Sequence, residues 1–380
     1  MLNRYVIKNG TLMSILDGSE QKADILVEDG RIAQIGGNVD TAGAEVFDAE
    51  GMYVSVGWLD AHCHFARLEP GAAIDDRSAL LCQGITYAVD MGSNGPDHFD
   101  AFRAQLHNIT DLRFKVYLNV GHAGIPGGTI KDYSCREDII PERVIDCVSA
   151  HRDEILGLKA RIDDKFCFDP IYVMDQMRAL GDELDIPIAV HAPRSLIGIE
   201  KLLTYLKKGD VLCHTLAGNS PAMMIVDESG RVKPCVLEAK ERGVIFDLSH
   251  GTNAYRYATA EAAWKAGFFV DTLSSDLHGG NLNGPVYNLG VVLSKIRGLT
   301  GKPWYWILNK AIAEPVRLQH IDDKAVEVKV GMPADLTVFK VEQGEYVWPD
   351  SAKETRTFSE KLTAVYTCTG TKVYTCTQRP

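Results

Sequence analysis

The feature that most constrains this sequence is the alternation of apolar strand segments with helical segments through the middle of the chain. Short apolar runs followed by stretches of helical pattern predict βα units, whose strands lie parallel in one sheet. Helices are expected, for example, over residues 170–184 and 254–267. The strand candidates number eight, over residues 54–62, 84–91, 112–120, 155–161, 186–191, 210–214, 243–249 and 268–275.

Eight strands alternating with helices predict an α/β fold of the (β/α)8 TIM-barrel type over residues 56–325. In such a barrel the active site lies at the carboxyl ends of the strands. A doubly wound open sheet is the rival architecture. It is disfavoured because no Gly-rich phosphate-binding loop follows the first strand candidate.

The two ends of the chain show a different pattern, in which short alternating strands are separated by turn residues. Hairpin signals of this kind occur near the start of the chain and again near its end, over residues 5–7, 23–27, 31–36, 326–330, 335–339 and 372–375. We therefore expect residues 1–55 and 326–380 to form one small β-sandwich domain beside the barrel.

Composition and charge restrict the partners of the protein. The 380 residues include 40 Lys and Arg against 51 Asp and Glu, and the resulting net charge of −11 repels nucleic acid. No apolar stretch is long enough to span a membrane and residues 1–10 contain no signal-peptide core, so we expect a cytoplasmic protein. The nine cysteines include no C-x-x-C pair, which argues against a structural zinc cluster. A homo-oligomer is compatible with these features.

Several residues that can bind metal occur where the predicted strands end. His62 and His64 close the first strand, and residues two apart on an extended chain project to the same side. His191 ends the fifth strand, His214 the sixth, and Asp276 follows the eighth. Any one of these residues could be an ordinary buried polar group. Because the carboxyl ends of barrel strands share one rim, the whole set predicts a metal site there.

Lys159 lies inside the apolar fourth strand, where a charged ammonium is costly to bury. Its amine can add carbon dioxide to form a carbamate, which is in effect a carboxylate and can bridge two metal ions. The alternative is a lysine whose ammonium pairs with an acidic neighbour. The histidines at the same rim favour the carbamate.

Taken together, these residues resemble the amidohydrolase superfamily. The resemblance covers essentially the whole chain and extends to the motifs at residues 57–62 and 331–336. Within the superfamily, the Gly-Leu-Lys-Ala-Arg run at 157–161 and the Asp-Leu-Ser-His-Gly run at 247–251 are most similar to the dihydroorotase-like branch that contains metal-dependent deacetylases.

The resemblance implies a binuclear metal centre with two divalent ions, usually zinc. His62, His64 and Asp276 would hold one ion, His191 and His214 the other, and carboxylated Lys159 and a hydroxide would bridge them. The hydroxide would attack the scissile carbonyl, and Asp276 would accept its proton and return it to the leaving group.

Four further residues are candidates for substrate binding. Arg161 shares the facing of Lys159 and could hold a substrate carboxylate, or could form an ordinary ion pair. His122, His250 and His278 follow strands three, seven and eight, where they could contact substrate or orient a loop. The polar loop 121–138 is a candidate lid, and an ordinary surface loop is equally compatible with its composition.

The leading hypothesis is a metal-dependent hydrolase of an amide or ester in a small carboxylated molecule, most simply a deacetylase of N-acyl or O-acetyl acids. A cyclic amidohydrolase of dihydroorotase or hydantoinase type is an alternative. Dihydroorotases carry an arginine two residues after the second histidine, but that position is Ala66 here and the arginine is Arg67. A deaminase is disfavoured because such relatives commonly lack the lysine, and a non-catalytic binding protein because the ligand set is complete.

Overall fold

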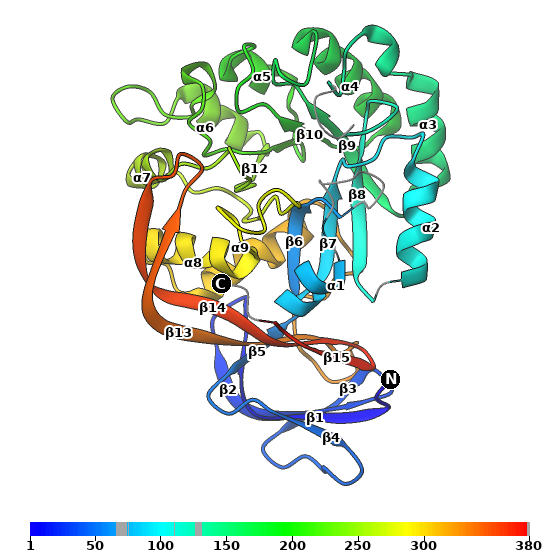
Figure 1. Cartoon of the computed structure of the whole chain (residues 1–380), viewed down its shortest axis with the longest axis vertical. Coiled ribbons are helices and arrows are strands. Elements are labelled where there is room, and N and C mark those ends of the chain that lie inside the picture. Colours follow the sequence, from blue (N-terminus) through cyan, green and yellow to red (C-terminus); the bar gives the residue numbers. More distant parts are fainter. Residues whose placement is uncertain (66–73, 75, 110, 126–130, 378–380) are drawn as a thin grey trace.

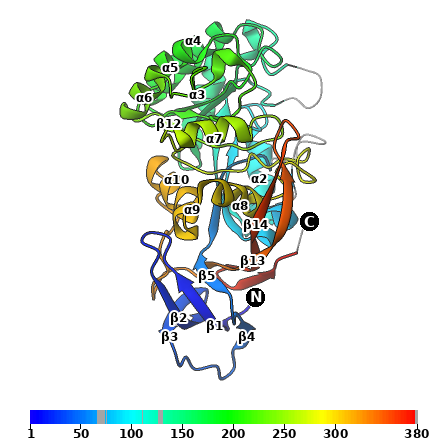
Figure 2. The same ribbon diagram turned by 90° about the vertical axis from the view of Figure 1, so that its left-hand side faces the viewer.

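The computed structural model describes residues 1–65, 74, 76–109, 111–125 and 131–377, and it contains two β-sheets (Figures 1 and 2). The central one is a curled sheet of seven parallel strands in the order β12-β11-β10-β9-β8-β7-β6. The strands are β6 (Trp58–Cys63), β7 (Ile85–Met91), β8 (Arg113–Asn119), β9 (Ile155–Arg161), β10 (Ile188–His191), β11 (Val211–Leu212) and β12 (Ile245–Phe246).

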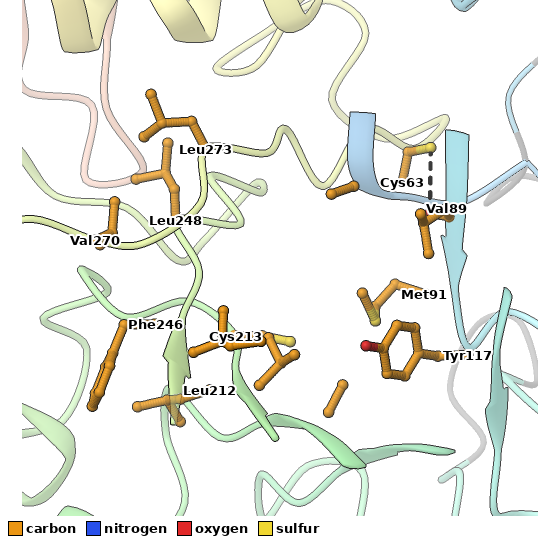
Figure 3. Packing of buried hydrophobic residues seen from close by; sticks show 14 of the residues in the cluster. Cys63, Val89, Met91, Tyr117, Leu212, Cys213, Phe246, Leu248, Val270 and Leu273 are labelled. Atoms are coloured by element: carbon orange, nitrogen blue, oxygen red, sulfur yellow. Dashed lines mark hydrogen bonds between the residues drawn. The ribbon is translucent and has the colours of Figure 1, made fainter. Parts of the chain in front are cut away.

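These strands form where the sequence is continuously apolar, because both faces of the curled sheet are covered. Every residue of β6 and of β7 is buried. Figure 3 shows Met91, Tyr117 and Cys213 directed into the space enclosed by the strands. The second to seventh predicted strands therefore correspond to observed ones, with β10, β11 and β12 shorter than expected, whereas the first, 54–62, divides between β6 and a strand of the second sheet, β5 (Tyr53–Val56).

The segment 268–275, predicted as an eighth strand, differs from the expectation because it forms no regular strand. It still connects the two edges of the curled sheet: Leu248 N donates to Thr272 O at 3.0 Å, and Asp276 N donates to His62 O at 2.7 Å. Side-chain bonding replaces a regular ladder, since the Ser274 and Ser275 hydroxyls donate to buried carboxylates, and Asp276 turns the chain with a φ of 51°. A closed eight-stranded barrel remains a prediction.

Helices follow most strands, and Figure 1 shows α2 to α6 arranged around the outside of the curled sheet. Asp169 caps α4 by accepting hydrogen bonds from two backbone amides, and Pro170 occupies its first turn. The helix predicted over 170–184 is confirmed, and the one predicted over 254–267 is shorter. The α-helices are α1 (Asp76–Ala79), α2 (Phe99–Ile109), α3 (Pro141–Ala150), α4 (Pro170–Leu184), α5 (Ile199–Tyr205), α6 (Pro234–Glu241), α7 (Tyr257–Lys265), α8 (Leu289–Thr300), α9 (Trp304–Ala311) and α10 (Ala313–Leu318).

The ends of the chain share the second sheet, whose order is β15-β14-β13-β5-β1-β2-β3, with β4 paired to β1. The junction between the two ends is the antiparallel pairing of β5 with β13. The predicted pairing of the ends is thus observed, whereas the two-layer sandwich and the boundaries 1–55, 56–325 and 326–380 remain predictions. The strands are β1 (Arg4–Met13), β2 (Glu20–Glu28), β3 (Arg31–Gly36), β4 (Glu45–Asp48), β5 (Tyr53–Val56), β13 (Asp335–Pro349), β14 (Thr355–Thr369) and β15 (Lys372–Thr375).

The β13–β14 hairpin is long and leaves the second sheet to run beside α8 towards α7 (Figures 1 and 2). Leu362 N on β14 donates to Ser294 Oγ on α8 at 2.8 Å, and at the hairpin tip Asp350 accepts from Tyr257 N at 3.0 Å. The hairpin therefore attaches the terminal sheet to the helices around the curled sheet. Within the described part of the chain, no helix has the length and apolarity needed to cross a bilayer.

Candidate metal centre

The predicted metal ligands converge at the carboxyl ends of the curled sheet. Ligand atoms of His62, His214 and Asp276 all lie within 4.8 Å of one another, and these three residues are buried. His64 adds a further nitrogen, because its Nε2 lies 3.1 Å from Asp276 Oδ1. His191 joins through His214, since the centroids of their rings are 4.3 Å apart. Residues at the ends of three strands, β6, β10 and β11, and one residue that follows the irregular segment 268–275 thus share one site.

Asp276 is the carboxylate at the centre of this group. Its Oδ1 lies 3.5 Å from His62 Nε2, and its Oδ2 lies 4.0 Å from His214 Nε2. Burial raises the pKa of Asp276, but its interactions with His64, His62 and His214 outweigh burial and hold the pKa well below its usual value. Gly251 makes room, because a Cβ there would lie 2.4 Å from Asp276 Oδ2.

His191 and His214 face each other as two metal-binding imidazoles would. His191 Nδ1 and His214 Nε2 are 2.6 Å apart. The other nitrogen of His214 donates to Ser249 O at 2.7 Å, and the other nitrogen of His191 faces Asp163 Oδ2 at 3.5 Å, so both outer nitrogens carry hydrogen. Burial lowers the pKa of both rings, which keeps them neutral. Two lone pairs then face each other, and a divalent ion bound to both nitrogens would remove the repulsion.

The two remaining histidines follow the same arrangement. His62 Nδ1 lies 2.9 Å from Ser249 Oγ and 3.5 Å from Asp247, while its Nε2 is turned to Asp276. His64 Nδ1 lies 2.9 Å from Ser93 Oγ, and its Nε2 is likewise turned to Asp276. All four histidines thus have one nitrogen held by a neighbouring polar group and one directed to the centre. This is how proteins orient imidazole ligands of metals, so the residues fit a metal site.

Lys159 is buried beside the histidines, with 1 % of its surface exposed. Its Nζ lies 3.0 Å from Cys213 Sγ, and among the described residues no carboxylate comes within 4 Å of it. After burial, its charge is the next largest cause that lowers the pKa of His62, to about 4. The close backbone of Gly92, where a Cβ would meet Lys159 Cγ at 2.5 Å, lets the side chain pass. The acidic neighbour of the alternative interpretation is therefore not seen in the described chain.

Arg161 is engaged in an ion pair. Its Nε and one terminal nitrogen lie 2.6 and 2.5 Å from the two carboxylate oxygens of Asp132, and its guanidinium lies over the ring of Phe166. Asp132 belongs to the loop 121–138, of which residues 126–130 lie outside the described chain. Ala66 and Arg67, where this sequence departs from the dihydroorotase pattern, also lie outside the described residues.

The three candidate substrate histidines have different surroundings. His278 is beside the centre, with its ring centroid 6.4 Å from that of His64 and its Nε2 2.9 Å from Thr252 Oγ1. His250 is buried and turned to Lys295, whose Nζ is 3.1 Å from its Nε2. His122 is half-buried and paired with Asp97 at 2.8 Å. The described structure therefore brings only His278 of these three to the ligand group.

Sequence reasoning missed the residues that hold the outer nitrogens of the ligands, which are Ser93, Asp163, Asp247 and Ser249. Asp247 and Ser249 could have been identified, because they belong to the Asp-Leu-Ser-His-Gly run. The run contributed to the prediction only through its similarity to the dihydroorotase-like branch. Its regular alternation of polar residues at the end of an apolar strand was the signal that could have placed both side chains on the site-facing side.

Comparisons with known proteins were made by sequence and by structure. A scan against protein-family models finds no match. The chain is 28 % identical over 342 residues to a deacetylase of Agrobacterium fabrum, covering 88 % of this chain and 82 % of that protein. It is 27 % identical over 374 residues to a deacetylase of Enterococcus faecalis, covering 96 % and 97 %.

Similar solved structures cover nearly the whole chain. A dihydroorotase superposes with a TM-score of 0.90 at 24 % identity, covering 99 % of this chain and 98 % of that one. An adenine deaminase superposes with a TM-score of 0.87 at 26 % identity, covering 98 % and 99 %. The same architecture thus carries different substrates in these proteins, and the chemistry of the site has to decide between them.

Proposed function

We propose that this chain is a metal-dependent enzyme of the amidohydrolase superfamily and that it hydrolyses an amide or ester bond in a small carboxylated molecule, most simply an N-acyl or O-acetyl acid. The observation that carries the proposal is the group of His62, His64 and His214, whose Nε2 atoms are turned to Asp276, with His191 facing His214. The similarity to two proteins named deacetylases over most of the chain supports the choice of substrate class.

In this proposal His62, His64 and Asp276 hold one divalent ion, and His191 and His214 hold a second. Nitrogen and carboxylate ligands suit zinc. Lys159 lies between the subsites as a carbamate: its neutral amine forms a bond to the carbon of carbon dioxide and loses one proton. The lack of a carboxylate within 4 Å of Nζ in the described chain supports this modification, because a buried ammonium without an acidic partner is costly. Bound ions would supply a hydroxide nucleophile at neutral pH and polarise the scissile carbonyl.

The protein residues supply proton transfer and orientation. Asp276 stays ionised because its pKa is low, so its carboxylate can accept the proton of the attacking water and deliver it to the leaving nitrogen or oxygen. The Nε edge of Arg161 is held by Asp132, which leaves its remaining N–H groups as donors for a substrate carboxylate. His278, next to His64, can donate to the carbonyl side of the substrate.

A cyclic amide is the second candidate substrate, favoured by the superposition on a dihydroorotase over nearly the full chain. The adenine deaminase superposes almost as well, but buried Lys159 supports the bridged centre that deaminating relatives commonly lack. Product analysis distinguishes the three activities: a cyclic amidohydrolase opens the ring of a cyclic ureide, a deacetylase releases acetate, and a deaminase releases ammonia.

The test begins with protein purified without chelator. We expect about two divalent ions per chain by elemental analysis, since two groups of ligands are available. The same protein should release acid from acylated hydroxy and amino acids, and Asp276→Asn should abolish this release without unfolding the chain. A folded protein that binds no added zinc would contradict the proposal, and so would a loaded enzyme that opens cyclic ureides while leaving every acylated acid intact.

A further inference from the structure

Ser249 contacts two of the candidate metal ligands at once. It is fully buried just beyond β12. Its Oγ lies 2.9 Å from His62 Nδ1, and its backbone oxygen lies 2.7 Å from His214 Nδ1. In the proposed function, His62 and His214 belong to different ions. One residue therefore touches both halves of the centre without being a ligand itself.

The direction of the hydrogen bonds follows from Asp247. This carboxylate is buried and accepts the hydroxyl hydrogens of Ser249, Thr272 and Ser274, the last two at 2.6 Å. Since an ionised carboxylate can only accept, the Ser249 hydroxyl hydrogen points to Asp247 and its lone pairs remain for another donor. His62 Nδ1 is then the donor to Ser249 Oγ. His62 Nε2 consequently keeps its lone pair and can bind a cation.

The backbone of Ser249 aims its carbonyl in the same way at the second ring. Ser249 lies three residues beyond the end of β12 and adopts a φ of 41°, with its carbonyl directed at His214. This unusual conformation is held from both sides: Ser249 N donates to Ser274 Oγ at 3.2 Å, and His250 N donates to Ser274 O at 3.2 Å. Because a carbonyl only accepts, His214 Nδ1 carries hydrogen and its Nε2 lone pair faces the centre.

We propose that Ser249 is a positioning residue that sets the tautomer and orientation of His62 and His214 together, and so couples the two ion subsites through one peptide unit. This inference rests on the proposed function for the assignment of the two subsites. The two contacts of Ser249 can be tested separately, since the hydroxyl bonds His62 and the backbone oxygen bonds His214. Removing only the hydroxyl should weaken the ion held by His62 and leave the other ion in place.

The experiment measures ion release from purified Ser249→Ala to increasing concentrations of a zinc chelator. We expect one of the two ions to bind about 10–100-fold more weakly than in the wild type, since outer partners of metal-bound histidines contribute effects of this size. The second ion should keep its wild-type affinity. Ser55→Ala is the matched control, because Ser55 is equally buried in β5 and, among the residues that the structure describes, its hydroxyl bonds only Val56 O.

A second variant, Asp247→Asn, tests the direction of the bonds. An amide at this position can donate to Ser249 Oγ, which turns the hydroxyl hydrogen towards His62 and opposes its Nδ1–H. We expect the same ion to be weakened, and cobalt substituted at this subsite should show an altered visible spectrum. The melting temperature of metal-free Ser249→Ala should stay close to that of metal-free wild type, whereas Asp247→Asn loses acceptor capacity for Thr272 and Ser274 and is judged by ion affinity in folded protein.

Unchanged affinity for both ions in folded Ser249→Ala would overturn the inference. Equal weakening of both ions together with a lower melting temperature of the metal-free variant would also overturn it, because this pattern indicates a purely structural role. If Ser249→Ala does not fold, Asp247→Asn decides by its affinity for the two ions. Failure of the proposed function is seen in the wild type alone, as lack of ion binding or of hydrolysis.

Discussion

Lys159, through its buried amine, is the residue whose chemistry most distinguishes the proposed centre from an ordinary cluster of histidines. Replacing it by alanine removes the atom that forms the carbamate. Lys159→Ala should lose more activity than the roughly 10–100-fold typical of an outer partner, because a bridging ligand is lost. Addition of a short carboxylic acid such as propionate should restore part of the activity, measured as initial rates against acid concentration.

The control for this prediction is Lys265→Ala, at the exposed end of α7, which should behave as the wild type. Activity that survives in Lys159→Ala, or a loss that propionate cannot restore in protein that still binds metal, would argue that Lys159 is not modified. Mass spectrometry under native conditions provides an independent reading of the bound carbon dioxide.

Single residues were predictable from the sequence where a local pattern constrains them. His62 and His64 lie two apart on an extended segment, and His191 ends an apolar run, so their placement at strand ends followed from periodicity. The function of Ser249 did not, because it depends on where residue 249 lies relative to residues 62 and 214. Hydrogen-bond partners so distant in sequence are set by the register of the sheet.

At the scale of elements, Lys295 links α8 to two other parts of the structure. It is fully buried, and its Nζ donates to Pro285 O at 2.6 Å, to Pro349 O at the hairpin tip at 2.8 Å and to His250 Nε2 at 3.1 Å. Burial, opposed in part by the charge of Asp350, lowers its pKa from 10.5 to about 7. This lysine therefore titrates near neutral pH in the folded protein.

The effect on stability has a definite sign. Between pH 7 and 10 the unfolded chain binds a proton at residue 295 that the folded chain does not, so the contribution of Lys295 to folding stability increases with pH. Relative to Lys295→Met, the wild type should gain about 2 kcal/mol between pH 7 and 9. Urea unfolding of both proteins at several pH values measures this difference, and a difference that is independent of pH would contradict it.

The elements themselves were predicted unequally. The strands β6 to β10 and the helix α4 follow from continuous apolar runs and a clear N-terminal cap. The segment 268–275 has a similar apolar content but is held by Ser274 and Ser275 through bonds to buried carboxylates of other strands. Such side-chain bonding cannot be distinguished from a regular strand by periodicity alone.

At the scale of the whole molecule, the proposed metal ligands come from segments that span most of the curled sheet, between His62 and Asp276. Bound ions should therefore stabilise the fold as a whole, by about 4 kcal/mol at a free concentration 1,000 times the dissociation constant. Removal of metal by a chelator should lower the melting temperature, and added zinc should restore it. If the ions bind but the melting temperature is the same with and without metal, the proposal that the site joins these strands is contradicted.

The broad architecture was also predictable, since the βα alternation and the hairpin patterns at both ends are visible in the sequence. The docking of the β13–β14 hairpin on α7 and α8 was not. It depends on single contacts such as Asp350 with Tyr257, which no local pattern reveals. The similarity to solved structures over nearly the whole chain agrees with the architecture. It does not identify the substrate, which depends on the residues of the site.

The pairing of β5 with β13 has a consequence for the synthesis of the protein. β5 lies between β1 and β13 in the sheet, yet β13 begins only at Asp335. At a ribosomal rate of 5–20 residues per second, the open edge of β5 waits roughly 15 to 60 s for its partner. An unpaired edge can recruit strands of other nascent chains. Yield in a host cell should therefore depend on translation speed and on chaperones that shield this edge until the last segment emerges.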